Sequence, residues 1–214
     1  MKIQRSQIQA ISATVLAAAA SAVAVYVEPY IQEAPPLNRA IYVVLGAPLL
    51  YSCFRLTEIL LRRLHYRAVL GEWHYVTISG SSFVDQNFAS MRFFFNKEGA
   101  LHYDVQLYPD LDSLRKGENP RGSARSEALD YEADLGILHI LYSVKLYADS
   151  FSRRGRLLLR LTRQRELRGE WSSVVEDGKL SVVSRGQMFA ARPKVFVDRH
   201  QKWLAHLERE GVAA

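Results

Sequence analysis

The sequence predicts an N-terminal hairpin of two transmembrane helices over residues 1–64, followed over residues 65–214 by an all-β antiparallel barrel of about eight strands and a C-terminal helix. Three observations support this fold class. Residues 6–27 carry no charged side chain. From Gly71 onward, apolar residues recur with a period of two, which is typical of half-buried strands. Turn residues interrupt that alternation at short intervals, and no helical crossover separates the expected strands.

The first apolar segment, IQAISATVLAAAASAVAVYV, predicts a transmembrane helix over about residues 8–28. It is long enough to cross a bilayer, which requires about 20 apolar residues. Residues 1–24 could instead be a secretory signal with AVA at 22–24 as its cleavage site. Because the apolar run continues beyond Ala24 and a second apolar segment follows at hairpin distance, two joined helices explain the pattern better.

The second apolar segment follows a short polar turn with adjacent prolines and predicts a helix over about residues 39–61. Basic residues flank the hairpin at both ends, with Lys2 and Arg5 before it and Arg62 and Arg63 after it. The positive-inside rule therefore places both termini in the cytoplasm.

Small residues repeat at intervals of four in the first helix, which would form a flat stripe for close association of helices in lipid. The positions are Ala13, Ala17 and Ser21, with Ala20 and Ala24 as a second pair. An alanine-rich helix contains such spacings in any case, so the sequence leaves both interpretations open.

The domain after residue 65 has the pattern of strands joined by tight turns. GEWHYVTIS forms the first expected strand. MRFFFNKEGALHYDVQLY and EALDYEADLGILHILYSVKLY are each expected to form a hairpin, with turns at 97–99 and 134–136. RRGRLLLRLTRQ alternates leucine with arginine, and LRGEWSSVVEDGKLSVVSRGQMFAA is a last hairpin with Asp-Gly at 177–178 as its turn signal.

Eight such strands with one apolar face each close naturally into a small up-and-down barrel, whose interior is packed or holds one small ligand. An open sheet would leave exposed edges, whereas a sandwich remains possible. The chain then predicts a helix over about residues 194–210, which we expect to pack on the barrel. Its apolar stripe comprises Phe196, Trp203, Leu204 and Leu207.

A longer connection, PDLDSLRKGENPRGSARS at residues 109–126, interrupts the strand pattern and predicts a loop or short helix. It carries Arg115, Arg121 and Arg125, which could form a basic lid at one mouth of the barrel. A solvated connection without that role is the alternative.

The sequence contains no pattern of catalytic or metal-binding residues. The six histidines are scattered, and none stands at a metal-ligand spacing. No glycine-rich phosphate loop opens a helix, and SGSS at 79–82 precedes no expected helix, which argues against a nucleophile elbow. Cys53 is the only cysteine, so no intrachain disulfide can form. We therefore expect a protein that is not an enzyme and needs no metal or cofactor.

Charge and aromatic content favour an anionic ligand. Of the 28 Lys and Arg residues only four precede residue 62, and the density in the rest is below that expected for binding a DNA or RNA duplex. Bases stack on aromatic rings, and phosphates pair with guanidinium groups. The same Tyr and Trp would equally make an ordinary barrel core, although their polar tips would then need partners. The aromatic candidates are Trp73, Tyr75, Tyr103, Tyr131, Tyr142 and Trp171, and the arginine candidates are Arg92, Arg156, Arg160 and Arg185.

Two short N-terminal transmembrane helices followed by an all-β barrel that opens with GEWHYV resemble the two-transmembrane β-barrel effectors of CBASS, the cyclic-oligonucleotide-based anti-phage signalling system of bacteria. The likeness covers nearly the whole chain, mainly as architecture, and carries over no binding residues. Gly-x-Trp in a first strand is also similar to lipocalins and fatty-acid-binding proteins.

The resemblance implies a cytoplasmic barrel that binds a cyclic dinucleotide made by a partner nucleotidyltransferase. It also implies that the ligand drives oligomerisation, after which the helices disrupt the bacterial inner membrane and kill the infected cell. Two alternatives stay open. One is a membrane-tethered, lipocalin-like carrier of a lipid or other hydrophobic ligand, and the other is a structural membrane scaffold with a filled barrel.

Overall fold

The computed structural model describes residues 35–79, 86–150, 152–177 and 180–209, with single positions between residues 10 and 32. Within these ranges it does not describe the side chains of residues 36–47, 50 and 174–183. The chain divides into two compact units, Met1–Arg67 and Ala68–Ala214, which we describe separately.

In the first unit, Pro36–Tyr66 forms one continuous α-helix, α2. A proline fits the first turn of a helix, because its missing N–H would have no helical acceptor there. The helix expected over residues 39–61 is therefore present and extends beyond both predicted ends. No helix in the described part of the chain is both long and apolar enough to span a membrane.

The expected small-residue stripe is described only in part. Ala13, Ala17 and Ser21 are helical and exposed, and Ser21 Oγ donates to the Ala17 carbonyl oxygen over 2.8 Å. Ala20 and Ala24 lie outside the described residues, as does most of the helix expected over 8–28. Association through this stripe stays a prediction.

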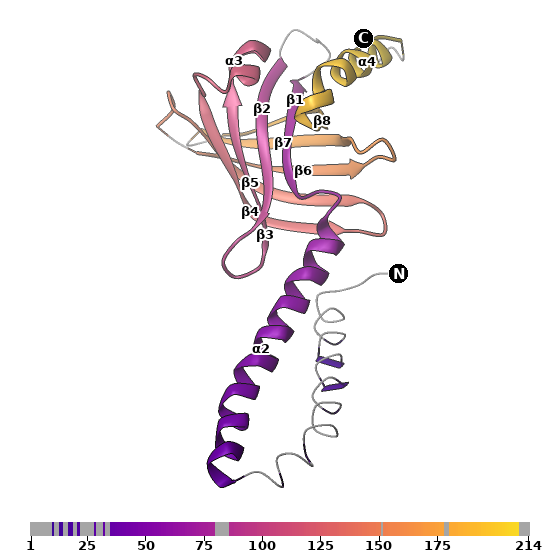
Figure 1. The fold of residues 1–214 in the computed structure, drawn as a ribbon. Coiled ribbons are helices and arrows are strands. Elements are labelled where there is room, and N and C mark those ends of the chain that lie inside the picture. Colours follow the sequence, from indigo (N-terminus) through magenta and orange to yellow (C-terminus); the bar gives the residue numbers. More distant parts are fainter. Residues whose placement is uncertain are drawn as a thin grey trace. The chain divides into compact units, whose positions relative to one another are not determined.

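The second unit is a closed barrel of eight antiparallel strands in sequential order, in which β8 pairs with β1 (Figure 1). The predicted up-and-down barrel is confirmed, and the sandwich is excluded. The strands are β1 Gly71–Ser79, β2 Gln86–Phe95, β3 Leu101–Tyr108, β4 Gly122–Glu132, β5 Ile137–Leu146, β6 Arg153–Leu161, β7 Leu167–Asp177 and β8 Leu180–Ala191.

Two of the predicted turns depend on glycines in the left-handed region. Gly99 and Gly136 have φ angles of 74° and 65°, which a residue with a Cβ adopts only with strain. Both lie where the sequence predicted them. At the third predicted turn Asp177 pairs with Leu180, and the two residues between them lie outside the described ranges.

The barrel has two ends, which we name by a residue at each. Strand β1 begins and strand β8 ends at the Trp73 end. The same end carries the β2–β3, β4–β5 and β6–β7 turns. At the Arg121 end lie the other four connections, including the β3–β4 connection that contains Arg121 and the short helix α3 (Leu111–Lys116).

The irregular connection expected over residues 109–126 is shorter than predicted, because β4 already begins at Gly122. Asp110 caps α3 by accepting a hydrogen bond of 2.7 Å from the Ser113 N–H, and this bond lowers the pKa of the Asp110 carboxyl group. Gly117 ends the helix with φ at 70°. Arg125 is therefore a residue of β4 and not of a lid.

The C-terminal helix α4 (Phe196–Arg209) follows a 3-10 turn at Pro193–Val195 and packs on the outside of the barrel (Figure 1). Its predicted apolar stripe is confirmed, since Phe196, Trp203 and Leu207 are buried and Leu204 is partly buried. The outward-facing strand residues buried in the same cluster are Val76, Ile78, Phe88, Tyr108, Phe189 and Ala191.

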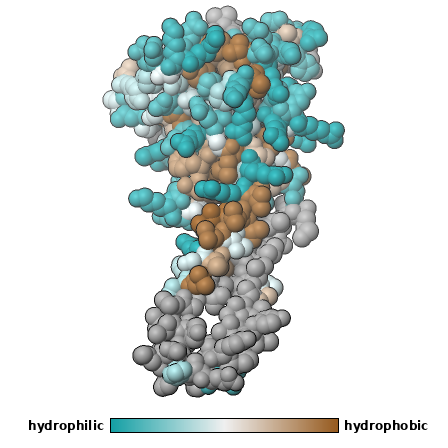
Figure 2. Space-filling model, viewed as in Figure 1, coloured by the Kyte–Doolittle hydropathy of each residue, from teal (hydrophilic) through white to brown (hydrophobic). Residues whose placement is uncertain are grey.

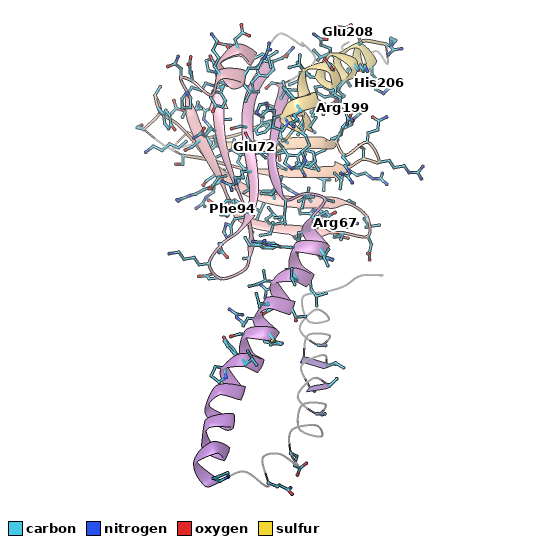
Figure 3. All side chains as sticks on the ribbon, in the orientation of Figure 1. Arg67, Glu72, Phe94, Arg199, His206 and Glu208 are labelled. Carbon is cyan, nitrogen blue, oxygen red and sulfur yellow. The ribbon has the colours of Figure 1, made fainter. Side chains whose placement is uncertain are left out.

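A buried carboxylate ties α4 to the barrel. Glu166, only 3% exposed, accepts hydrogen bonds from Arg168 Nη2 at 2.8 Å and from Arg199 Nη1 at 3.3 Å. Arg199 lies on α4 (Figure 3). Arg168 lies on β7. Much of the visible surface of the barrel is hydrophilic, with apolar side chains grouped between the hydrophilic ones (Figure 2).

His200 lies on the buried face of α4. Its ring stacks on Phe196 with centroids 5.6 Å apart and lies nearly perpendicular to the Phe88 ring, with centroids 5.7 Å apart. Among the described residues its Nε2 has no hydrogen-bond partner, and burial lowers the pKa of His200. A histidine in the unfolded chain keeps a pKa of about 6.5, so the unfolded state binds a proton first as the pH falls. The contribution of neutral His200 to the free energy of unfolding is therefore complete above about pH 6.5 and is lost as the pH falls below that value.

We expect a His200→Phe variant to lose less stability than the unmodified protein when the pH is lowered from about 7.5 to about 5.5. Urea midpoints at the two pH values measure the difference. His206→Phe is the matched control, because His206 lies on the same helix but is exposed (Figure 3). Equal acid sensitivity of His200→Phe and the unmodified protein would show that protonation of His200 does not loosen the packing of α4.

Candidate ligand-binding site

The barrel wall separates the two groups of candidate residues. Strand alternation turns the six aromatic candidates inward, where five are buried and Trp171 is half-buried. The four arginine candidates occupy the alternate positions and are exposed outside: Arg92, Arg156, Arg160 and Arg185. These arginines cannot reach a ligand that touches the interior aromatic residues, so the structure does not join the two groups in one site.

Trp73 belongs to a packed plug at its own end of the barrel. It is fully buried, and its Nε1 donates to the Val69 carbonyl oxygen over 2.8 Å. The Arg192 guanidinium lies 4.0 Å from the centre of the indole ring and donates to the carbonyl oxygens of Glu72 and Ala68. Burial and the nearby Arg165 lower the pKa of Arg192. These contacts close the Trp73 end, so this tryptophan is a core residue.

Tyr131 also belongs to the packed interior. It is 8% exposed and pairs across β4 and β5 with Leu138, which is fully buried. Leu138 in turn pairs with Leu159 of β6, which is equally buried. The interior near the Trp73 end is therefore filled by large apolar side chains.

Three tyrosines from three different strands form a group inside the barrel. Burial raises the pKa values of Tyr75 and Tyr103, and each is raised further by the neighbouring tyrosines. Burial raises the pKa of Tyr142 to about 12, and its hydroxyl donates to the Ser172 carbonyl oxygen over 3.3 Å. Tyr75 and Tyr103 are 7% and 2% exposed. Tyrosine hydroxyls gathered inside a barrel are suited to a polar ligand or ordered water.

Arg121 approaches the tyrosine group from the Arg121 end. Its Nη2 donates to Asn87 Oδ1 on β2, and its positive charge counteracts the rise in the pKa of Tyr75. Its Nε is buried and has no hydrogen-bond partner among the described residues. Its backbone is held on both sides, because its N–H donates to Leu107 and its carbonyl accepts from Tyr147. A guanidinium that is held in place and has a buried N–H without a hydrogen-bond partner can bind an anionic group.

The other two lid candidates lie elsewhere. Arg115 is exposed on α3, and Arg125 is exposed on the outer face of β4. Of the three lid candidates, the structure brings only Arg121 toward the interior aromatic residues.

Glycines provide the space that the remaining aromatic candidates occupy. A Cβ at Gly155 would lie 2.4 Å from ring atoms of Tyr142, and one at Gly186 would lie 2.7 Å from Trp171 Nε1. Trp171 Nε1 also donates to the Ile78 carbonyl oxygen over 3.3 Å. Trp171 follows Gly-Glu in the sequence, as Trp73 does, and its indole likewise lies inside the barrel. The glycines opposite the rings were the sequence signal for these close contacts.

The fold and these groups together define an eight-stranded closed barrel with one packed end and one end where a cation and tyrosine hydroxyls meet. No model of a known protein family matches the chain, and no curated protein matches it. Within the described residues, no three His, Cys, Asp or Glu side chains gather as ligands of a metal ion would.

Proposed function

We propose that the protein is a membrane-attached receptor-effector of anti-phage defence, without enzymatic activity, whose barrel binds a cyclic di- or oligonucleotide. Ligand binding promotes association of the transmembrane helices, which disrupts the bacterial inner membrane and causes abortive death of the infected cell. A partner nucleotidyltransferase supplies the ligand. The architecture quoted above supports the membrane part of this proposal, through the long uncharged run over residues 6–27 and the apolar residues of α2.

The observation that carries the ligand class is the position of Arg121 beside buried tyrosines. A cyclic dinucleotide has two phosphates and two bases, which a guanidinium and aromatic side chains recognise together. The buried Nε of Arg121, which has no partner among the described residues, would donate to such a ligand beside the neighbouring tyrosines. Loss of one charge-assisted hydrogen bond costs about 1.5 to 3 kcal/mol, which corresponds to a fall in affinity of roughly 10- to 100-fold.

Thermal unfolding of the full chain in lipid nanodiscs tests this function. We expect cyclic dinucleotides at saturating concentration to raise the unfolding temperature, because a ligand that binds only the folded state stabilises it. Arg121→Gln should lower the affinity by the factor given above, so the same rise in unfolding temperature should need a correspondingly higher ligand concentration. Arg115→Gln is the matched control, since Arg115 is exposed on the neighbouring helix α3, and it should respond like the unmodified protein.

The same experiment discriminates the alternatives. A rise with long-chain fatty acids and none with cyclic dinucleotides would indicate a carrier of hydrophobic ligands, which the leucine-rich interior of β5 and β6 would suit. No rise with either ligand class would indicate a scaffold with a filled barrel. Both results would contradict the receptor proposed here.

A further inference from the structure

A row of apolar side chains is exposed on the outer face of β5 and β6. Leu141 is 51% exposed and Leu158 is 39% exposed. They are neighbours, because Leu158 pairs across the two strands with His139, two residues from Leu141. Exposed Ala128 of β4 pairs with Leu141 on its other side. Single exposed leucines are ordinary on protein surfaces, whereas adjacent ones on a flat strand face are typical of contact sites.

Charges of opposite sign flank this row on the two neighbouring strands. The outer face of β4 carries Glu127, Asp130 and Glu132, with Arg125 as one basic residue nearer the Arg121 end, and the outer face of β6 carries Arg154, Arg156 and Arg160. We call the three acidic residues of β4 the acidic stripe and the three arginines of β6 the basic stripe.

Some of these charges are already engaged within the chain. Arg154 Nε lies 3.2 Å from Glu127 Oε1, in a pair whose side chains are 75% and 41% exposed, and His139 Nε2 lies 3.5 Å from Glu132 Oε1. Arg156, Arg160 and Asp130 are exposed, and none of the three has an ion-pair partner among the described residues.

We propose that β4, β5 and β6 form a self-association face, through which the barrels of two copies of this chain pair about a twofold axis parallel to β5. Such an axis brings β5 of both copies together and places β4 of each copy opposite β6 of the other. The acidic stripe of one copy then meets the basic stripe of the second, twice. An axis perpendicular to the strands would instead place β4 opposite β4, where like charges repel.

The strand register specifies the contacts. Leu141 lies on β5 and therefore on the axis, so Leu141 of one copy meets Leu141 of the other. Asp130, which is level with His139 and Leu158, then faces the second copy between its Arg156 and Arg160. The side chains lie within a narrow strip of three strands, which is the part of a convex barrel that a second barrel can touch.

Charge arrangement favours a second copy over other partners. A nucleic acid or an anionic membrane would be repelled by the acidic stripe one strand away from the basic one. This face carries negative charges on one side of the apolar residues and positive charges on the other. It is therefore complementary to a second copy of itself, as an isologous interface requires. This pairing does not depend on the ligand proposed above.

Cysteine cross-linking of the full chain in nanodiscs or native membranes tests the face. The native Cys53 is first replaced by serine, and a single cysteine is then introduced as Leu141→Cys. We expect oxidation to give several-fold more disulfide-linked dimer with Leu141→Cys than with Arg92→Cys. Arg92 is the matched control, because it is equally an exposed outer-face residue but lies on β2, three strands away. Equal cross-linking at both positions would overturn the proposal.

Charge-reversal variants distinguish pairing through this face from cross-linking that results only from association of the membrane helices. On the Leu141→Cys background, Arg156→Glu with Arg160→Glu gives both stripes a net negative charge, and Glu127→Lys with Asp130→Lys gives both a net positive charge. Each variant alone should lose the cross-linked dimer several-fold. Mixing the two, with tags of different size, should restore cross-linking only between unlike copies. Variants that cross-link alone as well as the parent does would overturn the charge pairing.

Discussion

Trp73→Ala is expected to lower the free energy of unfolding by about 3 to 5 kcal/mol, the usual range for removing a fully buried aromatic side chain. The indole is completely buried, donates a hydrogen bond to Val69 and lies beneath the Arg192 guanidinium. Its loss would leave a cavity at the Trp73 end and an arginine without its aromatic partner. Urea unfolding followed by circular dichroism measures the change.

Trp73→Phe is the graded control for this prediction. It retains most of the buried ring but loses the N–H donor to Val69, so the expected loss is about 1 to 2 kcal/mol. If Trp73→Ala destabilised the protein by less than about 1 kcal/mol, the Trp73 end would not be the packed plug described above.

Gly186→Ala is expected to destabilise the barrel by about 3 kcal/mol, the upper part of the usual range for overpacking. A Cβ at this position would lie 1.8 Å from the Ile78 carbonyl oxygen of the neighbouring strand and 2.7 Å from Trp171 Nε1. The carbonyl belongs to the β1 backbone and cannot turn aside as a flexible side chain would. The strands β8 and β1, whose pairing closes the barrel, would have to separate locally.

Gly117→Ala is the comparison for that variant. Gly117 has φ at 70°, but a Cβ there would meet no atom within 4 Å. Only the backbone conformation resists the change, at a cost of about 1 to 2 kcal/mol. Free energies of unfolding that are equal for the two variants would mean that β8 can move away from β1 without loss.

The predicted strand pattern was confirmed because it depends on short-range features. Alternation of apolar residues specifies the inner face of a strand, and glycines such as Gly99 and Gly136 specify its turns. The burial of Val76 and Ile78 on the outer face of β1 was not predicted. It depends on α4, which arrives from more than a hundred residues later in the chain.

The candidate site was predicted less well than the fold. Alternation correctly turned Tyr75, Tyr103 and Tyr142 inward, but the same rule turns Arg156 and Arg160 outward. Arg121 stands in an irregular connection, where periodicity predicts nothing. Its approach to Asn87 and Tyr75 follows from the position of the β3–β4 connection at the Arg121 end, which only tertiary structure specifies.

The even number of strands has a consequence for how this barrel can change. Since β1 enters and β8 leaves at the Trp73 end, an odd count would have sent the last strand out through the mouth beside Arg121. That mouth is instead bordered by four connections between strands and by neither junction to a flanking helix. Insertions or loop exchanges in these connections leave both junctions unchanged. In the receptor proposed above they would alter ligand choice without rebuilding the closure of the barrel, except at α3, whose Leu114 packs in the same buried cluster as α4.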